Sequence, residues 1–316
     1  MRDFIVRVNV DEAARYYGAF MALDALVTDL TAPASDGRAQ WDAARAQVPA
    51  GALVGTYLSS RDVLPDPARD PAPRFPSRAI ASAPGMKVLE APGGYRVFDY
   101  SDPPTRLAML KAAALAAETR RRDLGTGLLY MDNFSDEAMW PFAAQRGLSW
   151  RRTTDLMREY ASVCRSVGVR VWANVAYSVG TGSDVQLLAG AADGITLEMA
   201  LTPDVCARRD WLDAAIRAYA VLTGSGMAVT MIPVVRSGKY AHDPEVDFLA
   251  AAAASFGCRL AYAFTWDPRP EIWFLLERLG KRIGSPSLAY PTVTTKFERG
   301  TVQLDCSRRV AETTWH

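Results

Sequence analysis

The run LLYMDN at residues 128–133 is a short apolar segment that ends in a carboxylate, Asp132. A second run of the same kind, DGITLE at residues 193–198, ends in Glu198. Apolar runs of this length are typical of strands buried on both faces, as in a parallel sheet. Parallel α/β folds place their chemistry at the carboxyl ends of such strands. Two acids in this position are the minimum that cleavage of a glycosidic bond requires.

Around these two runs, the chain alternates short β-rich segments with longer helical patterns. The segments predicted as principal strands are residues 4–10, 25–30, 52–58, 127–131, 169–174, 194–197, 228–235 and 259–265. The helical patterns that follow them begin at residue 11 and then cover residues 36–48, 103–122, 148–167, 184–192, 203–222, 244–256 and 271–283. Eight strands, each followed by a helix, predict an α/β protein with the (β/α)8 TIM-barrel fold. A doubly wound sheet is the main alternative, but no glycine-rich phosphate motif follows the first strand.

Two additions interrupt this pattern. A proline-rich stretch at residues 65–84 cannot continue a helix or a central strand, so it predicts a long loop inserted after the third strand. An extra strand is expected within the insertion, at residues 95–100. After Gly284 an alternating pattern, with a hairpin turn at Arg299-Gly300, predicts a small C-terminal β appendage. We therefore expect a catalytic barrel over residues 1–284 and a β extension, packed on it, over residues 285–316.

The composition limits the classes of function. With 316 residues, of which 49% are hydrophobic and 22% charged, the chain has the make-up of a soluble globular enzyme. The formal net charge of +1 gives no field that would attract nucleic acid or an anionic membrane. No run approaches the roughly 18 apolar residues of a membrane span. No secretory leader is visible, which predicts a cytoplasmic protein unless a leader was removed. The oligomeric state does not follow from the sequence.

Cysteine and histidine usage argues against a metal centre or a cofactor. The cysteines lack CxxC spacing and are expected to be isolated core or surface thiols: Cys164, Cys206, Cys258 and Cys306. His242 and His316 are the only histidines, so a His-based triad or a multi-histidine site is nearly excluded. We therefore predict no metal and no cofactor.

The spacing of the two acids fits the barrel. Asp132 and Glu198 lie 66 residues apart, close to twice the roughly 31 residues of one βα unit. We therefore expect them on the fourth and sixth strands, facing one mouth. Carboxyl groups about 5–5.5 Å apart support a covalent retaining mechanism, and a separation of about 6.5–9.5 Å supports inversion. The alternative is that both acids only cap the helices that follow them.

Residues at the other strand ends are candidates for sugar contacts. Sugars present CH faces to aromatic rings and hydroxyl groups to fixed donors and acceptors. The candidate substrate-binding residues are Asp29, Tyr57, Arg61, Tyr130, Asn133, Trp172, Asn174 and Trp266. A tryptophan at a strand end can equally be core material, and Asn133 can serve a turn. Asp102, directly before two prolines, is expected to be a helix N-cap.

Several of these segments resemble the TIM-barrel glycoside hydrolases related to endo-α-1,4-polygalactosaminidases and to microbial barrels that cleave exopolysaccharides. The similar segments are GTYLSS at 55–60, FDYS at 98–101 with its two following prolines, LYMDN at 129–133, DGITLE at 193–198 and FERGTV at 297–302. The resemblance implies that Asp132 is the nucleophile, or the base in an inverting variant. It also implies that Glu198 is the general acid and that the substrate is a carbohydrate.

We therefore predict a glycoside hydrolase that cleaves a poly- or oligosaccharide. One alternative is a non-catalytic glycan-binding barrel, in which one acid has lost its role. Another is a barrel enzyme with different chemistry, such as an aldolase or isomerase. None of the lysines ends a predicted barrel strand, where a Schiff base would form, and this disfavours the last alternative.

Overall fold

The structure is a computed structural model that describes residues 6–9, 25–29, 45–46, 53–60, 80, 83–90, 96–135, 149–176, 185–198, 201, 203–231, 244–260 and 275–316. Its contacts divide the chain into two units. The first consists mainly of Val6–Ala176 and Gly190–Gly194, and the second mainly of Tyr177–Ala189 and Ile195–His316. Each unit is described by itself.

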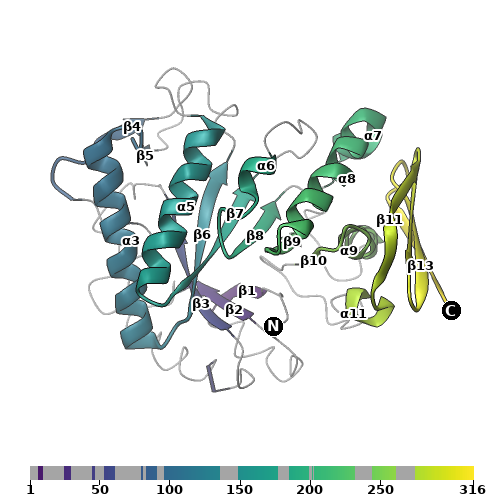
Figure 1. Ribbon diagram of the computed structural model, residues 1–316, viewed down its shortest axis with the longest axis horizontal. Helices are drawn as coiled ribbons and strands as arrows, with labels where there is room; N and C mark the ends of the chain where they lie inside the picture. Colours follow the sequence, from purple (N-terminus) through teal and green to yellow (C-terminus); the bar gives the residue numbers. More distant parts are fainter. Residues whose placement is uncertain are drawn as a thin grey trace. The chain divides into compact units, whose positions relative to one another are not determined.

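The first unit is built on a parallel sheet (Figure 1). In sheet order, its strands are β1 (Val6–Asn9), β2 (Ala25–Asp29), β3 (Leu53–Ser59), β6 (Leu128–Ser135) and β7 (Arg170–Ala176). Each strand pairs with its neighbour in parallel. Residues 128–132 of β6 are all buried, as expected for a strand covered on both faces. The prediction of a mixed α/β protein with a parallel sheet is therefore confirmed.

Helix α3 (Pro103–Leu124) connects β3 to β6 and positions the carboxyl edge of the sheet. It begins at Asp102, whose side chain accepts a hydrogen bond from the backbone N–H of Thr105, so the predicted N-cap is confirmed. It ends at Gly125, which has a left-handed backbone (φ 64°) that glycine adopts without steric cost. Because the helix runs back along the sheet, its N-terminus lies at the end where the parallel strands finish.

A second long helix, α5 (Trp150–Ser166), lies beside α3 in the first unit (Figure 1). A short hairpin precedes α3, in which β4 (Val88–Glu90) and β5 (Arg96–Phe98) pair antiparallel. The extra strand predicted at residues 95–100 is β5. Its partner β4 was not predicted.

The second unit contains β8 (Gly194–Glu198), apart from its first residue, and also β9 (Ala228–Met231) and β10 (Arg259–Leu260). β9 and β10 pair in parallel. The helices described in this unit are α6 (Val185–Leu188), α7 (Pro203–Ala207), α8 (Arg209–Gly224), α9 (Pro244–Phe256) and α11 (Leu275–Leu279). Each segment that the sequence predicts as a principal strand therefore contains a strand in the structure.

The chain ends in an antiparallel sheet of β11 (Arg282–Ala289), β12 (Thr292–Phe297), β13 (Gly300–Asp305) and β14 (Val310–Trp315), in that order. The predicted hairpin is confirmed, because Phe297 pairs with Gly300, but its turn is Glu298-Arg299, one residue before the predicted position. The alternate residues that β12 and β13 turn inward are buried, and α9 contacts β13 and β14. Covering one face in this way is the usual arrangement of an antiparallel sheet.

The helix predicted at residues 203–222 is interrupted in the structure. Arg208 has an extended backbone (φ −122°, ψ 118°) and separates α7 from α8. No glycine or proline marks this break, so the sequence pattern runs across it. The prediction of one continuous helix was wrong.

The last predicted helix, at residues 271–283, was too long at its C-terminal end. Gly280 has a left-handed backbone (φ 79°), which terminates α11, and Ile283 already belongs to β11. The division of the chain at residue 284, the closure of a barrel and the loop at residues 65–84 stay predictions. Most of that loop, and all but two residues of the helix predicted at 36–48, lie outside the described residues.

The four cysteines are buried and form no disulfide, but two of them contact each other. A hydrogen bond with Cys206, together with burial, raises the pKa of the Cys306 thiol. Nη1 of Arg309 lies 3.7 Å from the sulfur of Cys206 and donates to the carbonyl of Leu201 at 2.6 Å. The expectation of isolated thiols was therefore wrong for this pair, because a contact between residues so distant in sequence leaves no local signal.

Candidate active site

Asp132 lies at an irregularity in the pairing of β6 with β7. Met131 pairs with Ala173 and Phe134 with Val175, so two residues of β6, Asp132 and the one after it, face a single residue of β7. An extra residue of this kind is a β-bulge, and bulges commonly redirect a side chain next to an active site. On its other side, Asp132 pairs with the last residue of β3.

The residue opposite the bulge is Asn174, and it holds the carboxylate. Its Nδ2 donates a hydrogen bond of 2.6 Å to Oδ1 of Asp132. The exposed fraction is 8% for Asp132 and 1% for Asn174, so the contact is sheltered from water. A hydrogen bond to a charged acceptor in such a place is short and strong. Asp132 is therefore a buried carboxylate with a fixed orientation, inside β6 and level with the end of β3.

The backbone around Asp132 is held from the side of β3. The backbone N–H of Ser60, directly after β3, donates to the carbonyl of Asp132 at 3.0 Å. The hydroxyl of Tyr160 on α5 donates in turn to the carbonyl of Ser60 at 2.7 Å. Burial raises the pKa of Tyr160 well above its ordinary value, so the hydroxyl remains a donor at neutral pH. Sequence reasoning proposed neither residue for the site, since a buried helical tyrosine looks like core.

Aromatic residues occupy neighbouring register positions on β3, β6 and β7, two residues before the level of Asp132. Trp172 pairs with Tyr130 across β7 and β6, and Tyr130 pairs with Tyr57 on β3. Tyr130 is 1% and Trp172 4% exposed, so both rings lie within the fold. The indole of Trp172 covers Gly194, where a Cβ atom would lie 2.4 Å from Cδ2 of the ring. Only glycine leaves room for the ring in this position.

Asn174 and two residues near it in the first unit carry buried polar atoms with unused hydrogen-bonding capacity. The Oγ of Ser60, the Nε1 of Trp172 and the Oδ1 of Asn174 are buried and have no hydrogen-bond partner among the described residues. Buried polar atoms without partners are uncommon in native proteins, and each one calls for an explanation. A hydroxyl, an indole N–H and an amide carbonyl are groups that can bind the hydroxyls of a sugar.

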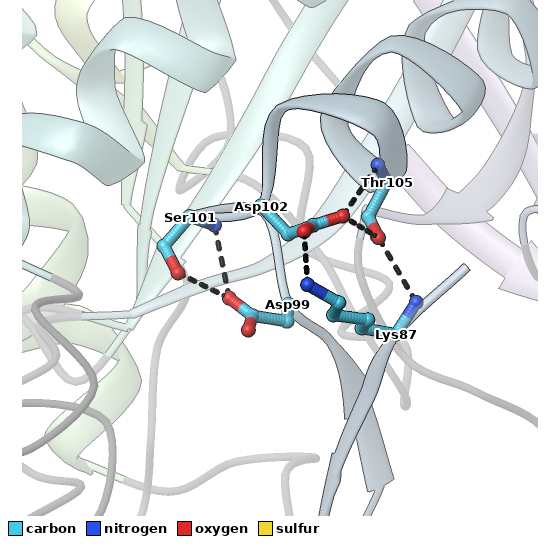
Figure 2. Close-up of polar contacts among 5 residues, drawn as sticks. All are labelled: Lys87, Asp99, Ser101, Asp102 and Thr105. Carbon is cyan, nitrogen blue, oxygen red and sulfur yellow. Dashed lines mark hydrogen bonds and ion pairs between the residues drawn. The ribbon is translucent and has the colours of Figure 1, made fainter. Parts of the chain in front are cut away.

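A second polar cluster lies at the start of α3, and its side chains bind one another (Figure 2). Oδ2 of Asp102 accepts from the N–H of Thr105 at 3.0 Å and from its hydroxyl at 2.7 Å, and Lys87 binds Oδ1. Asp99 accepts from the backbone N–H of Ser101 at 3.1 Å and from its hydroxyl. The hydrogen bond from Lys87, and then those from Thr105, lower the pKa of Asp102 to about 2. These contacts fix the entry to α3, so the cluster is a structural support at this end of the unit.

The other predicted site residues are described less completely. Glu198 is the last residue of β8, at the strand end where the sequence places it, and Asp29 is the last residue of β2. The backbones of Tyr57 and Asn133 belong to β3 and β6. The structure does not describe the side chains of Glu198, Asp29, Tyr57 or Asn133. The remaining predicted residues lie wholly outside the described residues: Arg61 and Trp266. That Asp132 and Glu198 share one mouth therefore stays a prediction.

In the described part of the chain, no group of three or more His, Cys, Asp or Glu side chains is placed to hold a metal ion. Over the same residues, no helix has both the length and the apolar character to cross a membrane.

The sequence matches no protein-family profile and no curated protein. Among solved structures it is similar to an α-amylase from Malbranchea cinnamomea, with a TM-score of 0.52 and 10% identity, over 95% of this chain and 78% of that one. It also aligns with endo-glycoceramidase II from Rhodococcus sp. in complex with ganglioside GM3, with a TM-score of 0.47 and 12% identity, over 95% and 87% of the two chains. A glycoside hydrolase family 20 β-N-acetylglucosaminidase gives a TM-score of 0.39 and 14% identity, over 72% and 51%. The first of these shows a shared fold.

Proposed function

We propose that the protein is a glycoside hydrolase that cleaves a poly- or oligosaccharide, with Asp132 as nucleophile or base and Glu198 as general acid. The setting of Asp132 carries the proposal. This buried carboxylate is held by Asn174 at 2.6 Å, and the amide oxygen of that asparagine is buried without a partner among the described residues. Reaction at a sugar carbon needs a carboxylate of fixed orientation, and sugar hydroxyls would supply the missing partners.

The proposed mechanism needs both acids at one mouth, so the proposal includes closure of the strands into a (β/α)8 barrel. Glu198 donates its proton to the departing glycosidic oxygen as the bond from that oxygen to the anomeric carbon breaks. In a retaining reaction, Asp132 forms a bond to the anomeric carbon, and a water molecule deprotonated by Glu198 then displaces it. In an inverting reaction, Asp132 takes the proton from a water that attacks directly.

The finer parts of the proposal come from the sequence, partly from the resemblance and partly from the pattern of strands and helices. They are the relation to polygalactosaminidases and exopolysaccharide-cleaving barrels, and a catalytic barrel at residues 1–284 with a β extension at 285–316. The proposal also includes sugar contacts by the candidate residues other than the two acids: Asp29, Tyr57, Arg61, Tyr130, Asn133, Trp172, Asn174 and Trp266. Nucleic acid and membranes are not proposed as partners.

The test begins with a panel of polysaccharides, oligosaccharides and activated aryl glycosides, with products identified by mass spectrometry. On the best substrates, Asp132→Asn is expected to lower kcat by about 10⁴-fold or more, since the group that attacks or activates water is gone. Glu198→Gln is expected to lose about 10²- to 10⁴-fold on a natural glycan. The loss should be much smaller on an aryl glycoside whose leaving group needs little acid assistance.

Matched controls make the same chemical changes elsewhere. Asp155→Asn alters an exposed carboxylate on α5 that forms a pair with Arg158, and Glu312→Gln alters one on β14. Both variants should keep full activity. An equal loss by Glu198→Gln on both substrate types would refute its assignment as the acid. Binding of oligosaccharides by the wild-type protein, without any product over days, would favour the alternative of a glycan-binding barrel.

A further inference from the structure

The orientation of the Asn174 amide is fixed by its contact with Asp132. Only the nitrogen end of an amide donates, so the bond of 2.6 Å to Oδ1 of Asp132 places Nδ2 against the carboxylate. A half-turn of the amide would bring its carbonyl oxygen against the carboxylate oxygen, and two acceptors repel each other. The Oδ1 of Asn174 therefore lies on the side of the amide away from this contact.

That oxygen is an unused acceptor. It is buried, and nothing in the described part of the chain donates to it. A buried acceptor without a donor is unfavourable, so a site that keeps one gains when a donor arrives. Trp172 lies two residues earlier on β7, and its side chain therefore projects from the same face. Its Nε1 is a buried donor that likewise has no partner within the described residues. One face of β7 thus presents an unused acceptor, on the residue that binds Asp132, and an unused donor two residues before it.

We propose that Asn174 has two partners during the reaction: its Nδ2 holds Asp132 in place, and its Oδ1 accepts a hydrogen bond from the bound sugar. This inference rests on the proposed glycoside hydrolysis and adds a positioning residue and a requirement on the substrate. If Asp132 acts at the anomeric carbon of an aldose, the nearest ring substituent is the one on C2. Hydrogen bonds to that group strengthen in the transition state. The substrate must then carry a hydrogen-bond donor at C2, as a hydroxyl or an N–H.

Two substitutions separate the two partners. Asn174→Asp keeps an acceptor oxygen but replaces the donor with a second carboxyl group facing Asp132. Asn174→Ala removes both the donor and the acceptor. If the alanine variant fails to fold, Asn174→Ser is used in its place. Each variant and the wild-type protein are assayed over a range of pH on the best aryl glycoside of the panel and on its 2-deoxy analogue.

The contact with the sugar is measured by a ratio: kcat/KM for the aryl glycoside divided by kcat/KM for its 2-deoxy analogue. Comparing this ratio between enzymes cancels the intrinsic reactivity of the 2-deoxy compound. The ratio is expected to be about 5- to 100-fold larger for the wild-type protein than for Asn174→Ala, since the variant has no acceptor left to lose. In Asn174→Asp the ratio should stay near the wild-type value, because an acceptor oxygen remains.

The pH profile reports on the contact with Asp132. In Asn174→Asp, two carboxyl groups share one site and retain a proton to higher pH, so the rising limb of kcat/KM moves to higher pH. A merely structural asparagine would lower stability without moving that limb. The control is Thr295→Val on β12, which removes another buried oxygen that has no partner among the described residues. It should leave the ratio and the pH profile unchanged.

The outcomes separate this inference from the proposed function. Equal ratios for the wild-type protein and Asn174→Ala, in an enzyme that hydrolyses glycosides, would overturn the sugar contact alone. An unmoved rising limb in active Asn174→Asp would overturn the positioning role. Failure of the wild-type protein to bind or cleave any glycoside of the panel would overturn both the inference and the proposed function.

Discussion

The indole of Trp172 lies so close over Gly194 that a Cβ atom on this glycine would come within 2.4 Å of Cδ2 of the ring. The atoms in contact belong to the rigid fused part of the ring, which cannot swing away without moving the whole side chain. We therefore expect Gly194→Ala to lower the free energy of unfolding by about 1–3 kcal/mol through overpacking. Urea unfolding followed by tryptophan fluorescence measures this change.

The matched control for that substitution is Gly224→Ala. Gly224 ends α8 and has open space where a Cβ atom would lie. Alanine is expected to be neutral or slightly stabilising there, since it restricts the unfolded chain. Equal stability of the two variants would contradict the close fit of Trp172 over Gly194.

Tyr160 offers a test of the support behind Asp132. Tyr160→Phe leaves the carbonyl of Ser60 without the hydrogen bond of 2.7 Å, which is expected to cost about 1–3 kcal/mol of unfolding free energy. Tyr219→Phe is the control, since the hydroxyl of Tyr219 is buried and has no partner within the described residues. That control should change stability by less than about 0.5 kcal/mol. Similar losses in the two variants would argue against a supporting role for Tyr160.

Asp102 predicts a dependence of stability on acidity. Its pKa is lowered from 3.8 to about 2, so the ionised form is favoured in the folded protein. The resulting stabilisation is complete above the unfolded value of 3.8 and is lost as the pH falls towards 2. Asp102→Asn keeps a good N-cap but loses the ion pair with Lys87. The difference in unfolding free energy between this variant and the wild-type protein should therefore shrink between these two pH values. If the difference in unfolding free energy stays constant down to pH about 2, the lowered pKa of Asp102 is refuted.

Two buried tyrosines are expected to limit the stability of the folded protein at alkaline pH. Burial raises the pKa of Tyr160 and of Tyr219 well above the ordinary value of 10.0. The folded protein holds these protons more tightly than the unfolded chain, so stability is complete below that pH and falls as the pH rises above it. Near-ultraviolet absorbance should show both phenols ionising only together with unfolding, as followed by circular dichroism. Ionisation of every tyrosine in the folded protein would contradict this expectation.

The reactivity of the cysteine thiols measures how well the folded protein shields its interior from reagents in solution. All four cysteines are buried and outside disulfides, and burial raises the pKa of Cys164 to about 12. A thiol reagent that reacts with the thiolate should therefore modify none of them in the folded protein and all of them in denaturant. Cys306→Ser can be used to assign a reactive thiol, if one appears, to the pair formed with Cys206. Fast modification of Cys164 under native conditions would show that the first unit opens readily.

The sequence was sufficient to place the strands, because each apolar run is short and bounded by turn or helix signals. It placed Glu198 at the end of β8 for the same reason, but the strand predicted to stop at Asp132 was too short, because β6 continues to Ser135. It could not show the bulge in β6, which depends on pairing with β7, nor the contact between Asn174 and Asp132. Those two residues are 42 positions apart, and Tyr160 and Ser60 are 100 apart. Such contacts are set by how the helices pack on the sheet, and no local pattern encodes them.

The bulge in β6 affects the chain at Asp132 without changing the register of the rest of the strand. Removing the residue after Asp132 would bring β6 into even pairing with β7, and Phe134 would keep its partner Val175. Phe134 would therefore stay buried against the ring of Tyr160, while the chain at Asp132 would lose the extra residue that bends it. Loss of a single codon here would alter the proposed site and leave the packing of the later residues in place.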